Sequence, residues 1–135
     1  MRGLALLASV GSVLVSFWLL SVVTVVLPRG NADQIPFWSI VMIGFFAFGS
    51  LSWYTVQHAN TPRILRTLLL LASAAAVLLG LAAIVENEIR TARTGDWEAY
   101  ISVMGIALAG HGVVLLTYLL RRKRVDSGAQ AALPG

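Results

Sequence analysis

Long apolar stretches alternate along the chain with short polar connections. Four stretches carry no Asp, Glu, Lys or Arg, and they cover residues 4–27, 37–57, 67–85 and 99–120. A membrane-spanning helix needs about 20 apolar residues, because each residue adds about 1.5 Å of rise and the hydrocarbon core is about 30 Å thick. Each stretch is therefore long enough to cross a bilayer once.

The pattern within the stretches favours helices over strands. Backbone amides have no water partner in lipid, so a spanning segment is either a helix or a strand of a closed barrel. Barrel strands alternate apolar and polar residues, and these stretches do not. The connections at residues 28–36, 58–66 and 86–98 are short, which makes sequential helices antiparallel neighbours. The sequence thus predicts an all-α fold, an integral membrane four-transmembrane-helix bundle with up-down-up-down topology.

The same pattern predicts one domain. Residues 1–126 are expected to form a single four-helix transmembrane domain, and residues 127–135, which are small, polar and rich in turn formers, a disordered cytoplasmic tail. The first apolar run is far longer than the roughly 7 to 15 residues of a signal-peptide core, so we interpret it as a retained span. Residues 86–93 are expected to extend the third helix past the membrane, and Gly95 to end it.

The basic residues predict an orientation for this bundle. Seven of the ten Lys and Arg residues lie at the ends that would share a side with both termini: Arg2, Arg63, Arg66, Arg121, Arg122, Lys123 and Arg124. Short cytoplasmic segments carry an excess of Lys and Arg, so both termini are expected in the cytoplasm. All of these residues except Arg2 are interpreted as lipid-facing basic anchors, each attracting anionic lipid by about 1 kcal/mol.

Composition excludes several classes of protein. The 135 residues are 58% hydrophobic and 12% charged, whereas a soluble domain carries about 25% charged residues. A soluble monomer is therefore excluded, and the net charge of +4 is interpreted as membrane topology rather than nucleic-acid binding. Without cysteine, and with six acidic residues and two histidines, few groups remain for catalysis, so we expect neither an enzyme nor a metal site. Nine Arg against one Lys indicate a GC-rich bacterial genome, and hence a bacterial cytoplasmic (inner) membrane.

Two helix faces carry small residues, which let helices approach closely in lipid. On the fourth stretch they recur at i, i+3, i+7 and i+10, and on the first at a similar spacing: Ser102, Gly105, Ala109 and Gly112, then Ser9, Ser12 and Ser16. We interpret both sets as helix-packing surfaces. A serine-lined polar pathway is the alternative.

His111 is the ionisable side chain nearest the middle of a predicted span, a position that by default suggests function. At 100° per residue it shares a helix face with Tyr100 and Tyr118, away from the small residues. These three are the candidate cofactor-binding residues, because an imidazole can ligate haem or hydrogen-bond a quinone. The alternative is a neutral histidine bonded to a hydroxyl or carbonyl of a neighbouring helix. The sequence itself requires no cofactor.

The sequence is compatible with three functions. The first is a non-enzymatic accessory or anchoring subunit that packs against other membrane proteins or against itself. The second is a homo-oligomeric small transporter or channel lined by the serines and His111. The third is a haem- or quinone-binding membrane anchor that uses His111. His58 lies roughly 15 Å from His111 along the membrane normal, which disfavours a haem held by both histidines.

Overall fold

The computed structural model describes residues 1–58, 60–95 and 99–132, and every element within these ranges is helical. The long helices are α1 (Arg2–Ser21), α2 (Ile35–Gln57), α3 (Arg63–Thr94) and α4 (Ala99–Ala132). Short helical turns join α1 to α2: η1 (Val22–Val26), η2 (Leu27–Arg29) and η3 (Ala32–Gln34). Among the described residues, four helices are long and apolar enough to cross a membrane. Because all the elements are helices, the prediction of an all-helical fold is confirmed.

The first helix changes from α-helical to π-helical and then to 3₁₀ geometry before it ends. After Ser21 the backbone widens into a π-helical turn and then tightens into a 3₁₀ turn that contains Pro28. Proline has no N–H, and its ring crowds the carbonyl four residues earlier, so the α-helical hydrogen bonds cannot continue through it. The β-branched run before it also favours the helix less. The first apolar segment therefore extends to Arg29 as three helical forms in succession.

The other helices begin and end where the sequence supplies local signals. Pro36 lies in the first turn of α2, where its missing N–H costs nothing. Pro62 occupies the cap position before α3. Gly95 ends α3 with φ +76°, a left-handed conformation that side-chain-bearing residues rarely adopt. The predicted helical extension of residues 86–93 and its end at Gly95 are confirmed.

Helix α4 is longer than the span predicted from hydropathy. It continues past the basic residues to Ala132, so residues 127–132 are helical, whereas the sequence predicts a disordered tail there. The difference has a local cause. Eight of the twelve residues from Arg121 to Ala132 are Arg, Lys, Ala or Gln, which are strong helix formers, and none of the twelve is proline. Residues 133–135 lie outside the described residues.

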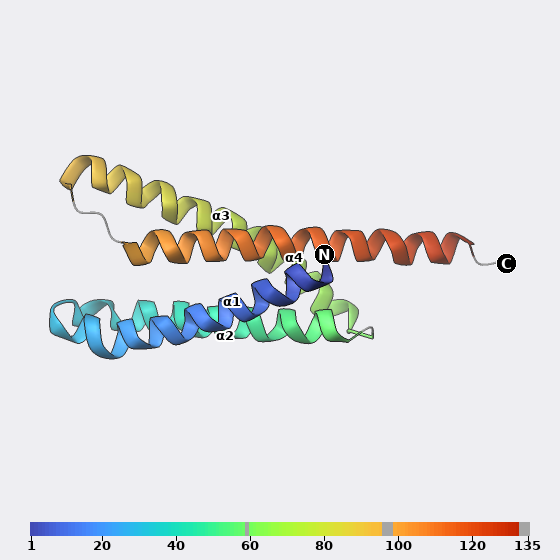
Figure 1. Cartoon of the computed structure of the whole chain (residues 1–135), viewed down its shortest axis with the longest axis horizontal. Coiled ribbons are helices and arrows are strands. Elements are labelled where there is room, and N and C mark those ends of the chain that lie inside the picture. The colour runs from blue at the N-terminus through green and yellow to red at the C-terminus, as the bar shows by residue number, and fades with distance from the viewer. Residues whose placement is uncertain (59, 96–98, 133–135) are drawn as a thin grey trace.

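The four helices are arranged as two pairs (Figure 1). The contact between α3 and α4 is the most extensive, followed by that between α1 and α2, and then by that between α1 and α4. By contrast, α2 and α3 touch little although they are consecutive. The molecule therefore consists of an α1–α2 hairpin and an α3–α4 hairpin, joined mainly along α1 and α4.

Glycines bring the helices of each pair close together. A Cβ atom on Gly80 of α3 would lie 2.6 Å from the carbonyl oxygen of Gly105, and one on Gly112 would lie 2.7 Å from that of Ser73. In the other pair, a Cβ on Gly49 would lie 2.9 Å from the carbonyl oxygen of Ser9. A side chain at any of these positions would meet backbone, so the glycines set the distance between paired helices.

Two hydrophobic clusters form the core. One contains Leu19, Val22, Val23, Leu27, Trp38, Phe45 and Met104. The other draws on all four long helices and contains Ala5, Val56, Leu69, Leu115 and Leu119. On each helix that contributes residues to both clusters, buried small or polar residues lie between the two clusters. His111 is one of these intermediate residues.

Candidate functional site

Buried polar side chains lie at or beside the level between the two hydrophobic clusters. We call the following set the polar layer: Ser9, Ser12, Ser16, Ser52, Ser73 and His111, none of which is more than 4% exposed. Most of the hydroxyls donate to a carbonyl three or four residues earlier in the same helix: Ser9 to Ala5, Ser16 to Val13, Ser52 to Phe48 and Ser73 to Leu69. These hydroxyls are thus satisfied within their own helices.

Ser12 departs from this pattern because it bonds to another helix. Its hydroxyl is hydrogen-bonded to Nδ1 of His111, 99 residues away in α4. His111 is 3% exposed and Ser12 is 2% exposed, so water does not compete for the bond. A hydroxyl both donates and accepts, so the bond can form with either neutral tautomer of the imidazole. It links the two hairpins through buried side chains.

The His111 ring also contacts α2. Its centroid lies 4.4 Å from that of Phe48, with the two planes tilted by 37°. The second ring nitrogen, Nε2, is buried and has no hydrogen-bond partner among the described residues. If Nδ1–H donates to Ser12, then Nε2 is a buried acceptor with an unused lone pair. Among the described residues, it is the buried side-chain atom of the polar layer that makes no hydrogen bond.

The structure places Tyr118 apart from His111. Tyr118 lies seven residues beyond His111, about 10 Å along the helix axis. It packs against the hydrophobic cluster around Leu115 and lines a separate cavity of about 410 Å³ with Gln57 and Arg122. The side chain of Tyr100 lies outside the described residues. Of the two candidates whose side chains are described, His111 lies in the polar layer and Tyr118 does not.

The small residues of α4 face α3. Gly105 and Ala109 lie against Gly80, and Gly112 lies against Ser73. Ser102 continues this face, because its hydroxyl accepts a 2.7 Å hydrogen bond from Nδ2 of Asn87. Thus α4 packs against α3 with one face and directs His111 to α1 from another.

The serines of α1 do not form a shared polar surface. The backbone of Ser9 packs against Gly49 of α2, whereas the side chain of Ser12 reaches α4. The hydroxyls of Ser9 and Ser16 bond to their own helix. The predicted helix-packing surface of α1 therefore contacts two different helices, α2 and α4.

Asn87 is a site residue that the sequence analysis did not single out. It is fully buried at the junction of α3 and α4, and its Oδ1 accepts a 3.3 Å hydrogen bond from Nη2 of Arg90. It follows the third apolar stretch, in a segment that the sequence predicts to be a solvent-exposed helix extension. The sequence feature that could have indicated its role is the spacing of three residues between Asn87 and Arg90, which places both side chains on one helix face.

Arg122 differs from the lipid-facing role that the sequence predicted. Its Nη1 donates to the carbonyl oxygen of Thr55 at 2.9 Å, and its Nη2 donates to that of His58 at 3.1 Å. The last carbonyls of a helix lack partners within it and carry partial negative charge. A guanidinium suits them, so Arg122 turns inward and caps the end of α2. Nearby, Arg2 donates to Oε1 of Gln57 at 3.1 Å.

The other predicted basic anchors are exposed or half-buried. Arg63, Arg121, Lys123 and Arg124 are exposed. Arg66 is half-buried, and its Nε lies 3.5 Å from the hydroxyl of Thr61, to which it donates. These side chains leave a basic surface beside the start of α3 and along α4.

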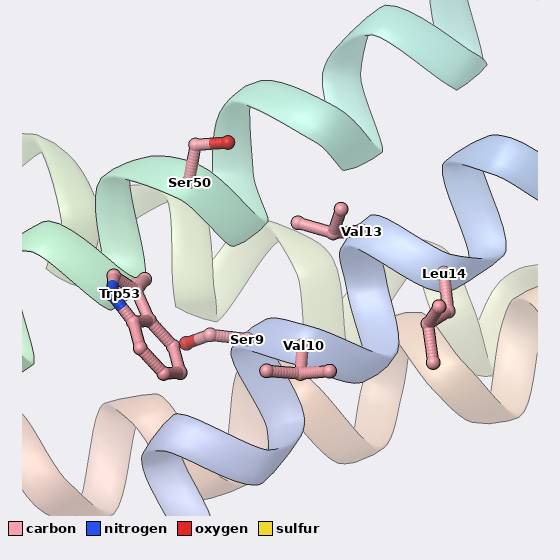
Figure 2. A pocket seen from close by; sticks show the side chains of 6 residues that line it. All are labelled: Ser9, Val10, Val13, Leu14, Ser50 and Trp53. Atoms are coloured by element: carbon pink, nitrogen blue, oxygen red, sulfur yellow. The ribbon is translucent and has the colours of Figure 1, made fainter.

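Two apolar grooves follow the contact between α1 and α2. The larger, of about 310 Å³, is lined by Ser9, Val10, Val13, Leu14, Ser50 and Trp53. Figure 2 shows Trp53 of α2 beside Ser9 of α1, with Val13 directed toward α2. The second, of about 250 Å³, lies further along the same two helices, between Phe17 and Phe46. His111 lines neither groove, and their apolar walls suit hydrocarbon rather than a polar solute.

No protein-family model, curated protein or solved structure matches the chain. The class of protein therefore follows from the fold and the site alone. It is a small all-helical protein whose four long helices are each apolar enough to cross a membrane, with a buried histidine that links its two hairpins.

Proposed function

We propose that this chain is a multi-pass protein of a bacterial cytoplasmic membrane and serves as a non-enzymatic accessory or anchoring subunit. Its four helices would cross the bilayer in up-down-up-down order, which the reversal of the chain between successive helices supports (Figure 1). Both termini would lie in the cytoplasm, because seven of the ten Lys and Arg residues would then be there. Its partners are other membrane proteins and anionic lipid.

The use of polar groups in the spans supports packing over transport. A transport path needs polar groups that face a channel or cavity. Here His111 bonds to Ser12 and contacts Phe48, and the neighbouring hydroxyls bond to their own helices. Within the polar layer, the Ser12–His111 bond therefore joins two helices. This is the observation that carries the proposal.

The outer helices offer surface for partners. In the most apolar stretch of α2 and of α3, 22% of residues are buried, against 33% in α1 and α4. Large apolar side chains on these two helices are strongly exposed, with Ile40 at 71%, Ile64 at 76% and Leu78 at 70%. In a membrane such faces meet lipid or another helix, so α2 and α3 are the surfaces on which we expect partner subunits.

The experiment is a native mass measurement on protein extracted from its own membrane in mild detergent. We expect a complex that contains other polypeptides together with the 14.5 kDa chain. A mass equal to a whole multiple of this chain alone contradicts the accessory function. That result would favour the homo-oligomeric transporter or channel, for which the next measurement is solute flux in vesicles with His111→Ala as the variant.

A haem or quinone anchor is the second candidate, and the buried Nε2 of His111 favours it. Metal-binding histidines commonly use one ring nitrogen as ligand while a protein group holds the other. Ser12 holds Nδ1 in this way. An absorption band or an added cofactor mass in the extracted protein, lost in His111→Ala and kept in Ser16→Ala, would establish this function.

A further inference from the structure

A cavity of about 390 Å³ lies where α2 begins and α3 ends. Its walls come from the turn before α2, the first turn of α2, the last third of α3 and the start of α4. The volume is within the range of about 300 to 1,000 Å³ typical of ligand sites. We call this cavity the end cleft.

The rim of the end cleft carries charges of both signs. Asp33 contributes a carboxylate from the turn before α2, and Glu86 contributes another from α3. Arg90, one helical turn beyond Glu86, contributes a guanidinium. Because Arg90 donates to Asn87 and Asn87 donates to Ser102, a chain of hydrogen bonds holds the guanidinium in place. The guanidinium is thus preorganised, and the rim offers charges of both signs to a ligand with both a cationic and an anionic group.

The floor of the end cleft is apolar. Trp38 is 5% exposed and Met104 is 8% exposed, and Ile101 and Ala83 complete the floor. The indole of Trp38 is held by a 3.3 Å hydrogen bond from its Nε1 to Oε1 of Gln34. A polar rim above an apolar floor matches an amphiphile with a charged head and a hydrocarbon body.

We propose that the end cleft binds the headgroup of a zwitterionic phospholipid that carries a primary amine, an ethanolamine phospholipid. Arg90 would hold the phosphate, and Asp33 and Glu86 the ammonium group. The glycerol backbone and first methylene groups would lie over Trp38 and Met104. This assignment rests on the proposed membrane insertion, which puts the ends of α2 and α3 at the depth of lipid headgroups.

The charges of the rim select among phospholipids. Among the described residues that line the cleft there are two carboxylates and one guanidinium, an excess of negative charge that disfavours an anionic lipid without an amine. A primary ammonium has three N–H donors for the carboxylates, as the lysine ammonium does, whereas a trimethylated choline has none. We therefore expect ethanolamine lipid to bind better than choline lipid, and choline lipid better than glycerol lipid.

The test is lipid titration of the purified full chain in detergent, with bound lipids counted by native mass spectrometry. Short-chain phosphatidylethanolamine should fill one saturable site about tenfold more tightly than phosphatidylcholine or phosphatidylglycerol, the scale of one charge-assisted hydrogen bond. Equal affinity for the three lipids would overturn the proposal. Soluble glycerophosphoethanolamine should compete at least about tenfold more weakly than the lipid, since it lacks the apolar body. Competition at equal concentration would assign the cleft to a free headgroup instead.

Paired variants test the residue assignments. The double variant Asp33→Asn/Glu86→Gln should lose the preference for ethanolamine lipid, whereas Glu88→Gln, an exposed carboxylate of α3 outside the cleft, should keep it. Arg90→Gln should weaken all three phospholipids, with Arg93→Gln as its control. Both Asp33 and Glu86 are exposed, so their substitution leaves the packing intact, and unchanged helicity by circular dichroism verifies this.

The outcome separates this inference from the proposed function. Lipid binding is measured on the isolated chain, so it does not depend on partner subunits. A chain that binds ethanolamine lipid but is extracted without partners refutes the accessory function alone. A chain that is extracted with partners but shows no preference among lipids refutes the end-cleft assignment alone.

Discussion

At the scale of single residues, His111 of α4 contacts one residue of α1 and one of α2. Ser12 bonds to Nδ1 and Phe48 covers the ring. The sequence identified His111 as the residue to explain and included a hydroxyl partner among the alternatives. It did not identify Ser12, because Ser9, Ser12 and Ser16 look equivalent along α1 and only the packing of α4 distinguishes them.

Ser12→Ala should destabilise the fold by about 0.6 to 2 kcal/mol, the range for side-chain hydrogen bonds between membrane helices. The loss arises because Nδ1 of His111 would remain buried without its partner. The measurement is unfolding in mixed detergent micelles, followed by circular dichroism.

Ser16→Ala provides the control for this prediction, since its hydroxyl bonds to its own helix. A double variant Ser12→Ala/His111→Leu should lose less than the sum of the two single losses, because both polar partners are then absent. Equal effects of Ser12→Ala and Ser16→Ala would show that the bond contributes nothing to stability.

Arg122 makes a second prediction at this scale. Arg122→Gln should cost about 1 kcal/mol, because it removes charge-assisted hydrogen bonds to the end of α2. Amide hydrogen exchange at residues 55–58 should become faster as this end frays. Arg121→Gln, which alters an exposed neighbour, should change neither quantity, and a similar change in both variants would contradict the cap. Hydropathy could not indicate this role, since the bonded carbonyls are more than 60 residues away.

At the scale of elements, the small residues of α4 determine how closely it approaches α3. The spacing of Ser102, Gly105, Ala109 and Gly112 identified one face of this helix from the sequence. The helix that covers it could not be identified in the same way, because α1 and α3 both carry small residues. The length of α4 was also underestimated, since hydropathy locates the apolar part of a helix and not its polar continuation.

Gly112→Ala should destabilise the α3–α4 pair by about 1 to 3 kcal/mol through overpacking. The new Cβ would lie 2.7 Å from the carbonyl oxygen of Ser73, and backbone there can move only if the helices separate. The same detergent unfolding assay measures the loss.

Gly110→Ala is the matched control in the same helix. Nothing lies within 4 Å of a Cβ at Gly110, so the substitution should be neutral or stabilise by up to about 1 kcal/mol through helix propensity. A neutral Gly112→Ala would mean that the helices tolerate a wider separation.

At the scale of the whole molecule, the proposed orientation predicts which helix ends face the cytoplasm. Cysteine labelling can test this, because the chain has no cysteine of its own. Single cysteines can be introduced at exposed positions, Glu88→Cys in α3 and Lys123→Cys in α4. In intact cells a membrane-impermeant maleimide should label the first and not the second. Lys123→Cys should react only after the membrane is permeabilised, and the reverse pattern would contradict cytoplasmic termini.

Because α2 and α3 make little contact, we expect the chain to assemble also from two separate fragments, one for each hairpin. Each hairpin holds its own helices together through glycine contacts, and the hairpins meet mainly through α1 and α4, so the covalent link between α2 and α3 adds little to their docking. Two separately translated fragments, residues 1–59 and 60–135, should therefore reassemble in the membrane and co-purify. Ser12→Ala in the first fragment should reduce the yield of this complementation, whereas Ser16→Ala should not.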